Sequence, residues 1–125
     1  MTDAFDLNTT YLNIKDDRAT EIDGTTFWQL PEDEINRLAD GWLVAAFLVE
    51  DDTHWEMHPA GDEVLTVVSG ALTLIQETKD GERRIEMPAG ASAINPAGTW
   101  HRFTVGEPAR LLAMTYGEGT QHRPL

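Results

Sequence analysis

Residues 54–63, HWEMHPAGDE, place two of the chain's four histidines among three acidic residues within ten positions. Imidazole nitrogens and carboxylate oxygens together form the ligand set that Zn, Fe(II), Mn, Ni and Cu use in proteins. A polar stretch with turn residues such as Pro59 and Gly61 is equally typical of a solvated loop. Two interpretations therefore stay open at this point: one edge of a metal site, or an exposed turn.

The alternation of a β-strand decides which side chains of this stretch can meet. Residues two apart in a strand point to the same face. If the segment is extended, His54, Glu56 and His58 share one face, and Trp55 and Met57 occupy the other. We therefore expect the two histidines and the intervening carboxylate to converge, with Trp55 packing away from them.

Two later segments show the same alternation and could complete the cluster. Glu63, Leu65 and Val67 share one face, and His101 and Phe103 share another. If all these faces point into one barrel, its interior holds a polar cluster at one end and apolar residues beyond. Burying such a cluster is costly unless its members bind a metal, a ligand or each other.

The elements that would position these side chains are short apolar segments separated by Gly and Pro, which predict an all-β sandwich or small barrel. A jelly-roll barrel fits both the length and the pattern, with at most one short helix in residues 31–40. The tail from residue 117 onward is expected to be loose, with His122 simply exposed. The predicted strands are 10–14, 19–22, 26–30, 41–50, 83–87, 91–95, 101–105 and 109–116, and two within 63–77 joined by a hairpin turn at Ser69-Gly70, with a second hairpin turn at Asp80-Gly81.

Composition limits the possible partners. The 125 residues predict a single domain over 1–125, and a net charge of −13 disfavours nucleic acid and membrane as partners. The chain has no cysteine, so thiolate nucleophiles and Cys-zinc sites are excluded. The acidic start, MTDAFDLNTT, does not read as a signal peptide, and we expect a cytoplasmic location.

Two spaced motifs resemble those of the cupin superfamily, G-x5-H-x-H-x3,4-E-x6-G and G-x5-P-x-G-x2-H-x3-N. HPAGDEVLTVVSG, residues 58–70, matches the second half of the first motif, and GASAINPAGTWH, residues 90–101, matches nearly all of the second. The resemblance covers about residues 41–116, with residues 1–40 as an N-terminal extension. It implies a double-stranded β-helix, or jelly-roll barrel. The chain departs from the pattern at Glu56, which replaces the first His of the pair, and at Val105, which replaces the final Asn.

The resemblance implies that His58, Glu63 and His101 bind one divalent metal ion, with Fe, Mn, Zn and Ni as candidates. Glu56 occupies the fourth ligand position, giving a site of two histidines and two carboxylates. Two alternatives remain open: Glu56 is a catalytic base beside a three-ligand site, or His54 replaces it as ligand.

The function that the resemblance implies is a metal-dependent enzyme, of dioxygenase or isomerase type, acting on a small polar substrate at the barrel mouth. His54, Leu65, Val67 and Phe103 would line its substrate pocket. The alternatives are a non-catalytic module that binds or senses a small ligand or metal, and a structural protein whose site has decayed.

The resemblance also implies a homodimer that pairs through its outer sheets and N-terminal strands. Residues 10–30, with Phe27 and Trp28, are the expected contact.

Overall fold

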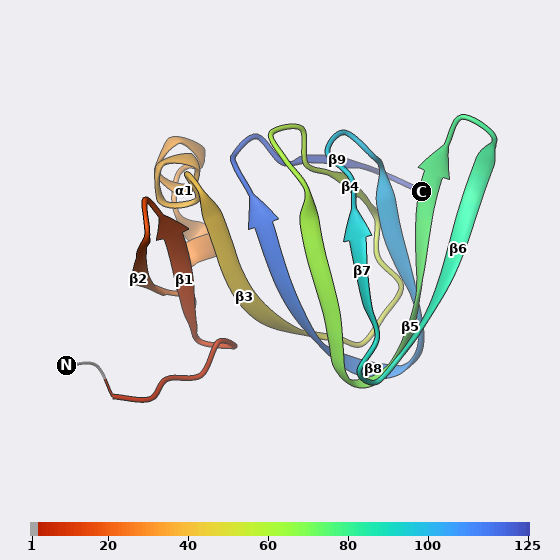
Figure 1. Ribbon diagram of the computed structural model, residues 1–125, viewed down its shortest axis with the longest axis horizontal. Coiled ribbons are helices and arrows are strands. Elements are labelled where there is room, and N and C mark those ends of the chain that lie inside the picture. Colours follow the sequence, from red (N-terminus) through yellow and green to blue (C-terminus); the bar gives the residue numbers. More distant parts are fainter. Residues whose placement is uncertain (1–2) are drawn as a thin grey trace.

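A computed structural model describes residues 3–125 and shows a curled antiparallel sheet with one short α-helix at its side (Figure 1). The predicted all-β barrel with a single helix between residues 31 and 40 is confirmed. Within the described range the elements are β1 (Thr10–Lys15), β2 (Arg18–Asp23), the 3-10 helix η1 (Phe27–Gln29), α1 (Glu32–Leu38), β3 (Trp42–Val49), β4 (Trp55–Met57), β5 (Glu63–Thr78), β6 (Gly81–Pro88), β7 (Ser92–Asn95), β8 (His101–Tyr116) and β9 (Gln121–Arg123).

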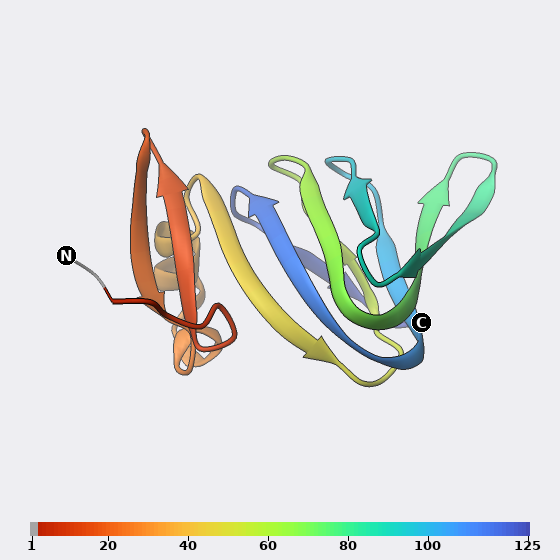
Figure 2. The ribbon, with the colours of Figure 1, turned by 60° about the horizontal axis from the view of Figure 1, so that its bottom comes forward.

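Two long bent strands, β5 and β8, run through both layers of the barrel. The first half of β5 pairs with β7 and with the second half of β8, which continues to β3, β1 and β2. The second half of β5 pairs with β6 and with the first half of β8, which continues to β4 and β9. Seen from below, the sheet folds over at the bend shared by β5 and β8 (Figure 2).

The bend lies at Gly70, where the sequence had predicted a hairpin turn. That prediction is wrong, because β5 runs on from Glu63 to Thr78 with bulges between Val67 and Leu72. Gly70 has a φ of +80°, and a Cβ there would lie 2.1 Å from the carbonyl oxygen of Pro108 in β8. A β-bulge needs the same left-handed conformation as a tight turn. The Ser69-Gly70 pair therefore predicts a hairpin turn equally well, although it forms a bulge here.

The strands predicted at 101–105 and 109–116 are likewise one strand, β8, which bends at the same level. In contrast, the second predicted hairpin is confirmed, with its turn at Lys79-Asp80, one residue before the predicted Asp80-Gly81, because Thr78 pairs with Gly81 at the end of β5 and β6.

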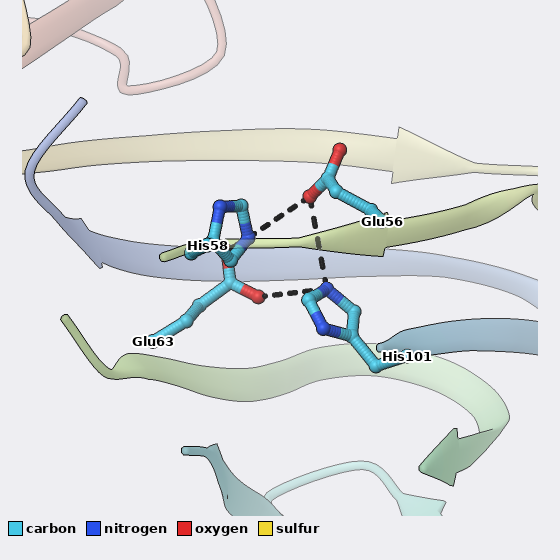
Figure 3. Close-up of side chains that lie close together, drawn as sticks. All are labelled: Glu56, His58, Glu63 and His101. Atoms are coloured by element: carbon cyan, nitrogen blue, oxygen red, sulfur yellow. Dashed lines mark ion pairs between the residues drawn. The ribbon is translucent and has the colours of Figure 1, made fainter. Parts of the chain in front are cut away.

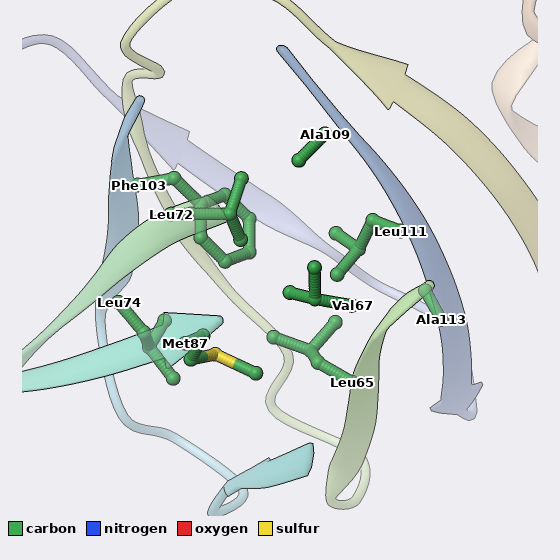
Figure 4. Close-up of a cluster of buried hydrophobic side chains, with 9 residues drawn as sticks. All are labelled: Leu65, Val67, Leu72, Leu74, Met87, Phe103, Ala109, Leu111 and Ala113. Carbon is green, nitrogen blue, oxygen red and sulfur yellow. The ribbon is translucent and has the colours of Figure 1, made fainter. Parts of the chain in front are cut away.

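The hydrophobic core fills the space between the two layers (Figure 4). A second cluster lies between β1, β2, η1 and β3, and Phe47 packs against both clusters. The N-terminal elements are thus joined to the barrel by apolar packing as well as by the β1–β3 pairing. The main core comprises Leu65, Val67, Leu72, Leu74, Met87, Phe103, Ala109, Leu111 and Ala113, and the second cluster comprises Tyr11, Ile22, Phe27, Leu43 and Ala45.

Residues 26–30, predicted as a strand, contain the 3-10 helix η1 instead. The tight turn directs Phe27 inward, where it is 0% exposed and packs edge-on against Tyr11 at 5.7 Å between ring centres. Phe27 is therefore not available as the intersubunit contact that the sequence suggested. Trp28 remains 54% exposed.

The tail is not loose as expected, because β9 pairs with β4, with Trp55 opposite Arg123. Arg123 forms an ion pair with Glu77 at 2.5 Å, and its guanidinium lies over the rings of Trp55 and Trp100 at 5.0 and 4.6 Å. These contacts hold β9 beside β4 at the edge of the sheet. No helix within residues 3–125 is long and apolar enough to cross a membrane.

Candidate metal centre

Four titratable side chains converge at one end of the barrel (Figure 3). Glu56 lies on β4, His58 follows that strand, and Glu63 and His101 begin β5 and β8. One nitrogen or carboxylate oxygen from each lies within 4.8 Å of all the others. The structure thus brings together the four residues that the sequence motifs predicted as ligands.

Strand pairing explains why these side chains meet. Glu56 on β4 lies directly opposite His101 on β8, so their side chains extend from adjacent backbones toward the same interior. Glu63 is the first residue of β5 and faces Asn95 of β7 and Thr115 of β8. The ends of both layers therefore contribute to the cluster.

Three of the four distances between ligand atoms match those expected around a single ion, and the fourth is slightly longer. Nε2 of His58 lies 3.0 Å from Oε1 of Glu56 and 3.0 Å from Oε2 of Glu63. Nε2 of His101 lies 3.3 Å from Oε1 of Glu63 and 3.7 Å from Oε1 of Glu56. Around an ion bound at about 2.1 Å, neighbouring ligand atoms stand roughly 3.0 to 3.4 Å apart.

Each histidine uses its other ring nitrogen outside the cluster. Nδ1 of His58 lies 3.0 Å from the hydroxyl oxygen of Thr120, and Nδ1 of His101 lies 3.3 Å from the carbonyl oxygen of Thr99. A hydrogen on Nδ1 that is donated to these oxygens leaves the Nε2 lone pair facing the centre, which is the arrangement a metal-binding imidazole needs.

Glu63 is held at both carboxylate oxygens. The hydroxyl of Thr115 donates to Oε2 at 2.6 Å, and the side-chain amide of Asn95 donates to Oε1 at 3.1 Å. Gln76 in turn donates to Asn95 at 2.9 Å. Because Glu63, Asn95 and Gln76 are all buried, this chain of hydrogen bonds fixes the carboxylate before any ligand arrives.

The cluster perturbs the protonation of its members. Burial opposes a charge on His58, but contacts with the carboxylates of Glu56 and Glu63 outweigh burial and raise the pKa of His58 to about 9. For Glu56, burial raises the pKa, but contacts with His101 and His58 outweigh burial and lower it well below the usual range. The pKa of Glu63 is also lowered, because His58, His101 and Thr115 together outweigh the effect of burial.

Nε2 of His58 supplies the test of whether a metal fits. This atom is buried, and although two carboxylate oxygens lie 3.0 Å away, it has no hydrogen-bond partner of acceptable geometry. A buried nitrogen without a partner is unfavourable unless another atom binds it. The Glu-His-Glu-His cluster could therefore bind one metal ion, and its donor set suits one.

A cavity of about 700 Å³ opens beside the cluster and is walled by β3, η1, α1 and residues 117–120 of the tail. Leu65 and Phe103, which the resemblance places in the substrate pocket, line this cavity together with Glu56, His58 and Glu63.

Two residues predicted for the pocket lie elsewhere. Val67 is 0% exposed within the core, because the side chains of β5 at this depth face the opposite layer. His54 is exposed and lines only a second cavity of about 220 Å³ on the other side of Glu56. His54 is also outside the four-residue cluster, since the chain becomes extended only at Trp55.

Sequence reasoning missed several residues around the site. Thr120 contacts His58, and Nδ1 of His122 lies 3.7 Å from Oε2 of Glu56, so His122 is part of the surroundings of the site although it is exposed. No local signal marks these two tail residues. Asn95 could have been found, because it shares a strand face with Ala91 and Ala93 and is polar where that face enters the interior.

Comparison with known families gives one match. Residues 45–115 match the family model described as the cupin domain. No curated protein matches the chain.

Several solved structures share the fold. They include Fe(II)-HppE with the alternative substrate (S)-1-HPP (TM-score 0.54, 23% identity, 61% of this chain and 43% of that chain). Hydroquinone 1,2-dioxygenase from Sphingomonas sp. TTNP3 with 4-hydroxybenzoate bound has a TM-score of 0.55 at 17% identity over 63% of this chain and 61% of that one. Bacillus subtilis oxalate decarboxylase, a protein with Mn(II) centres, has a TM-score of 0.60 at 18% identity over 76% of this chain and 26% of that one. The chain spans only 26 to 61% of the lengths of these proteins, and the likeness concerns the fold.

Proposed function

The chain belongs to the cupin family, and on that premise we propose that it is a divalent-metal-dependent enzyme of the dioxygenase or isomerase type. Its substrate would be a small molecule held in the 700 Å³ cavity beside the cluster. Glu56, His58, Glu63 and His101 would hold the ion. The Fe(II) and Mn(II) of the structural neighbours support a divalent first-row metal as the cofactor.

The single observation that carries the proposal is the convergence of four ligand atoms, one each from Glu56, His58, Glu63 and His101, within 4.8 Å of one another. Nε2 of His58 is one of these atoms; it is buried without a well-formed hydrogen bond, and the hydroxyl of Thr120 contacts the other nitrogen of its ring. Two imidazole nitrogens and two carboxylate oxygens around one point form a donor set that divalent first-row metals use in proteins.

A bound divalent ion supplies a Lewis acid that can hold and polarise an oxygen or nitrogen atom of a substrate. The protein's own residues then have separate tasks. His58, His101 and Glu63 are buried and fixed by outer hydrogen bonds, so they hold position. Glu56 is more exposed and presents Oε1 to the cluster and Oε2 to His122, 3.7 Å away. Oε2 of Glu56 is thus the carboxylate oxygen that faces away from the cluster toward His122, which is where Glu56 would act if its role is that of a base rather than a ligand.

The first experiment is elemental analysis by plasma mass spectrometry of protein purified without an affinity metal or chelator and then reconstituted with Fe(II), Mn(II) or Zn(II). We expect close to one ion per chain in the wild type and almost none in the double variant His58→Ala/His101→Ala. His54→Ala is the matched control, since it also removes an imidazole but lies outside the cluster, and its metal content should equal that of the wild type.

The alternative function, binding or sensing without catalysis, predicts the same metal content and is separated by turnover. Absence of metal from the wild type after reconstitution would overturn the proposal. Loss of metal in His54→Ala would show that the ligand set is wrongly assigned.

A further inference from the structure

We infer that the cavity selects neutral or cationic molecules with an apolar, ring-sized body and excludes anions. The inference rests on the proposed function, because it names the class of substrate for the same site. It is carried by the charges and the wall chemistry around the 700 Å³ cavity.

No basic side chain other than histidine faces either cavity. The chain has nine lysines and arginines, all within the described residues, and none of them lines the larger or the smaller cavity. Several are engaged elsewhere by ion pairs with Asp40, Glu34 and Glu77. The nine are Lys15, Arg18, Arg37, Lys79, Arg83, Arg84, Arg102, Arg110 and Arg123.

Acidic side chains do line the larger cavity. Glu56 and Glu63 belong to the cluster, and Glu32 at the start of α1 and Glu118 in the tail stand on the walls. Glu32 and Glu118 are exposed, and neither is among the ion pairs formed by residues 3–125. Among residues 3–125 they therefore add negative charge to the cavity that no lysine or arginine neutralises in an ion pair.

The metal ion would not reverse this balance. Its two positive charges are offset by the two carboxylates of Glu56 and Glu63, so the loaded cluster attracts an anion only weakly. Glu32 and Glu118 then remain, and an anion entering the cavity would lose its hydration next to two like charges. A cation would meet opposite charges at the same place.

The apolar residues of the cavity wall also favour neutral or cationic molecules with an apolar ring. Trp28, Phe47 and Phe103 present aromatic surface to the cavity, and Leu65 and Leu111 add aliphatic surface. Aromatic faces attract cations as well as apolar rings, and the attraction grows where water is excluded. A volume of about 700 Å³ is ample for a molecule with one ring.

Three probes with the same ring test the inference: benzyltrimethylammonium, benzyl alcohol and benzoate. The cation has no lone pair, so its binding cannot come from coordination to the metal. Dissociation constants would be measured by ligand-observed NMR on Mn-free, Zn-reconstituted protein at pH 7, with metal content determined on the same sample. We expect the cation to bind at least about tenfold more tightly than benzoate, with the alcohol between them, and added salt to reduce the difference.

The variant Glu32→Gln/Glu118→Gln should bring the affinities for the cation and for benzoate several-fold closer while leaving zinc content unchanged. The matched control, Glu82→Gln/Glu107→Gln, removes the same net charge from exposed positions outside the cavity and should keep the preference.

Benzoate binding as tightly as the cation, or no binding of the cation, in protein that holds one zinc would overturn the inference while the proposed function stands. Protein that takes up no zinc would overturn the proposed function and, with it, this inference.

Discussion

Thr120 is not one of the four cluster residues, but it contacts one of them, His58. Its hydroxyl lies 3.0 Å from Nδ1 of His58, and a hydrogen donated from Nδ1 to this oxygen leaves the Nε2 lone pair facing the centre. Partners of this kind commonly contribute 10- to 100-fold to metal affinity. We expect Thr120→Val, which keeps the shape but removes the hydroxyl, to weaken zinc binding by about that factor in a titration with a competing zinc indicator. Thr120→Ser keeps the hydroxyl and should bind zinc as the wild type does.

Glu56 has two open roles, ligand and base, and one substitution separates them. Glu56→Gln preserves size but removes the charge that lies 3.0 Å from Nε2 of His58. If Glu56 is a ligand, metal affinity falls markedly, because a neutral amide oxygen is a weaker donor than a carboxylate. Plasma mass spectrometry after dialysis measures this loss. Unchanged metal content together with lost turnover would assign Glu56 as the base.

The raised pKa of His58 sets the pH dependence of metal binding. With a pKa of about 9, the imidazole of His58 is positively charged at neutral pH in the metal-free protein. A metal ion that binds Nε2 must displace the proton on that nitrogen. Apparent zinc affinity should therefore rise with pH, by about tenfold per unit between pH 6.5 and 8.5 if one proton is released. Indicator titrations across this range measure the slope, and a flat profile would contradict the prediction.

The same shift affects the stability of the metal-free protein in the opposite sense. A folded-state pKa raised from 6.5 to about 9 contributes stability that is fully present below about pH 6.5. That contribution is lost as the pH rises toward 9. The contribution of His58 to the stability of the metal-free protein is therefore largest at low pH, where zinc affinity is lowest.

At the scale of elements, the bend shared by β5 and β8 joins the two layers that supply the ligands. Gly70 permits it, with a φ of +80° and no room for a Cβ beside Pro108. We expect Gly70→Ala to lower the free energy of unfolding by more than about 2 kcal/mol, since backbone strain and a steric clash add. Gly90→Ala is the control: its φ is +89° but its surroundings are open, so only the strain of about 1 kcal/mol remains. Urea unfolding measures both variants, and equal losses would contradict the argument.

The elements also show how far the sequence predicts the structure. Alternation and turn residues located most strands and the helix, because both are local properties of the chain. The signal at Gly70 was misread, since a bulge and a hairpin turn require the same backbone conformation. The strand β9 could not be found, because its stability comes from the contacts of Arg123 with Glu77, Trp55 and Trp100, which are distant in the sequence.

The candidate site was predictable to the same extent. Motif spacing and strand parity identified the four residues that the structure brings together. The alternation of strand residues alone could not decide whether Glu56 or His54 joins the cluster. That choice depends on where β4 begins. Thr115 and Thr120, which hydrogen-bond to Glu63 and His58, lie far from the motifs in the sequence. Strand pairing and the path of the tail bring them to the site, and no sequence pattern near the motifs points to them.

For the whole molecule, the open edge of β2 offers a surface for a second copy. Within the described residues β2 pairs only with β1, so its outer backbone groups face solvent. Such an edge can pair with another strand. We expect a homodimer through the N-terminal strands, with Trp28 rather than Phe27 available nearby. Light scattering after gel filtration should give twice 13.9 kDa, and a mass of 13.9 kDa would contradict the prediction.

The pairing of β4 with both β8 and β9 also decides when the site exists during folding. Glu56 lies opposite His101 and His122, so β4, which carries Glu56 and leads into His58, acquires its neighbours only after distant parts of the chain have come together. Such long-range pairings form slowly and late. An ion then encounters a complete site only after the barrel has closed. Bound metal would therefore stabilise the folded protein by slowing its unfolding, and the folding rate would stay unchanged.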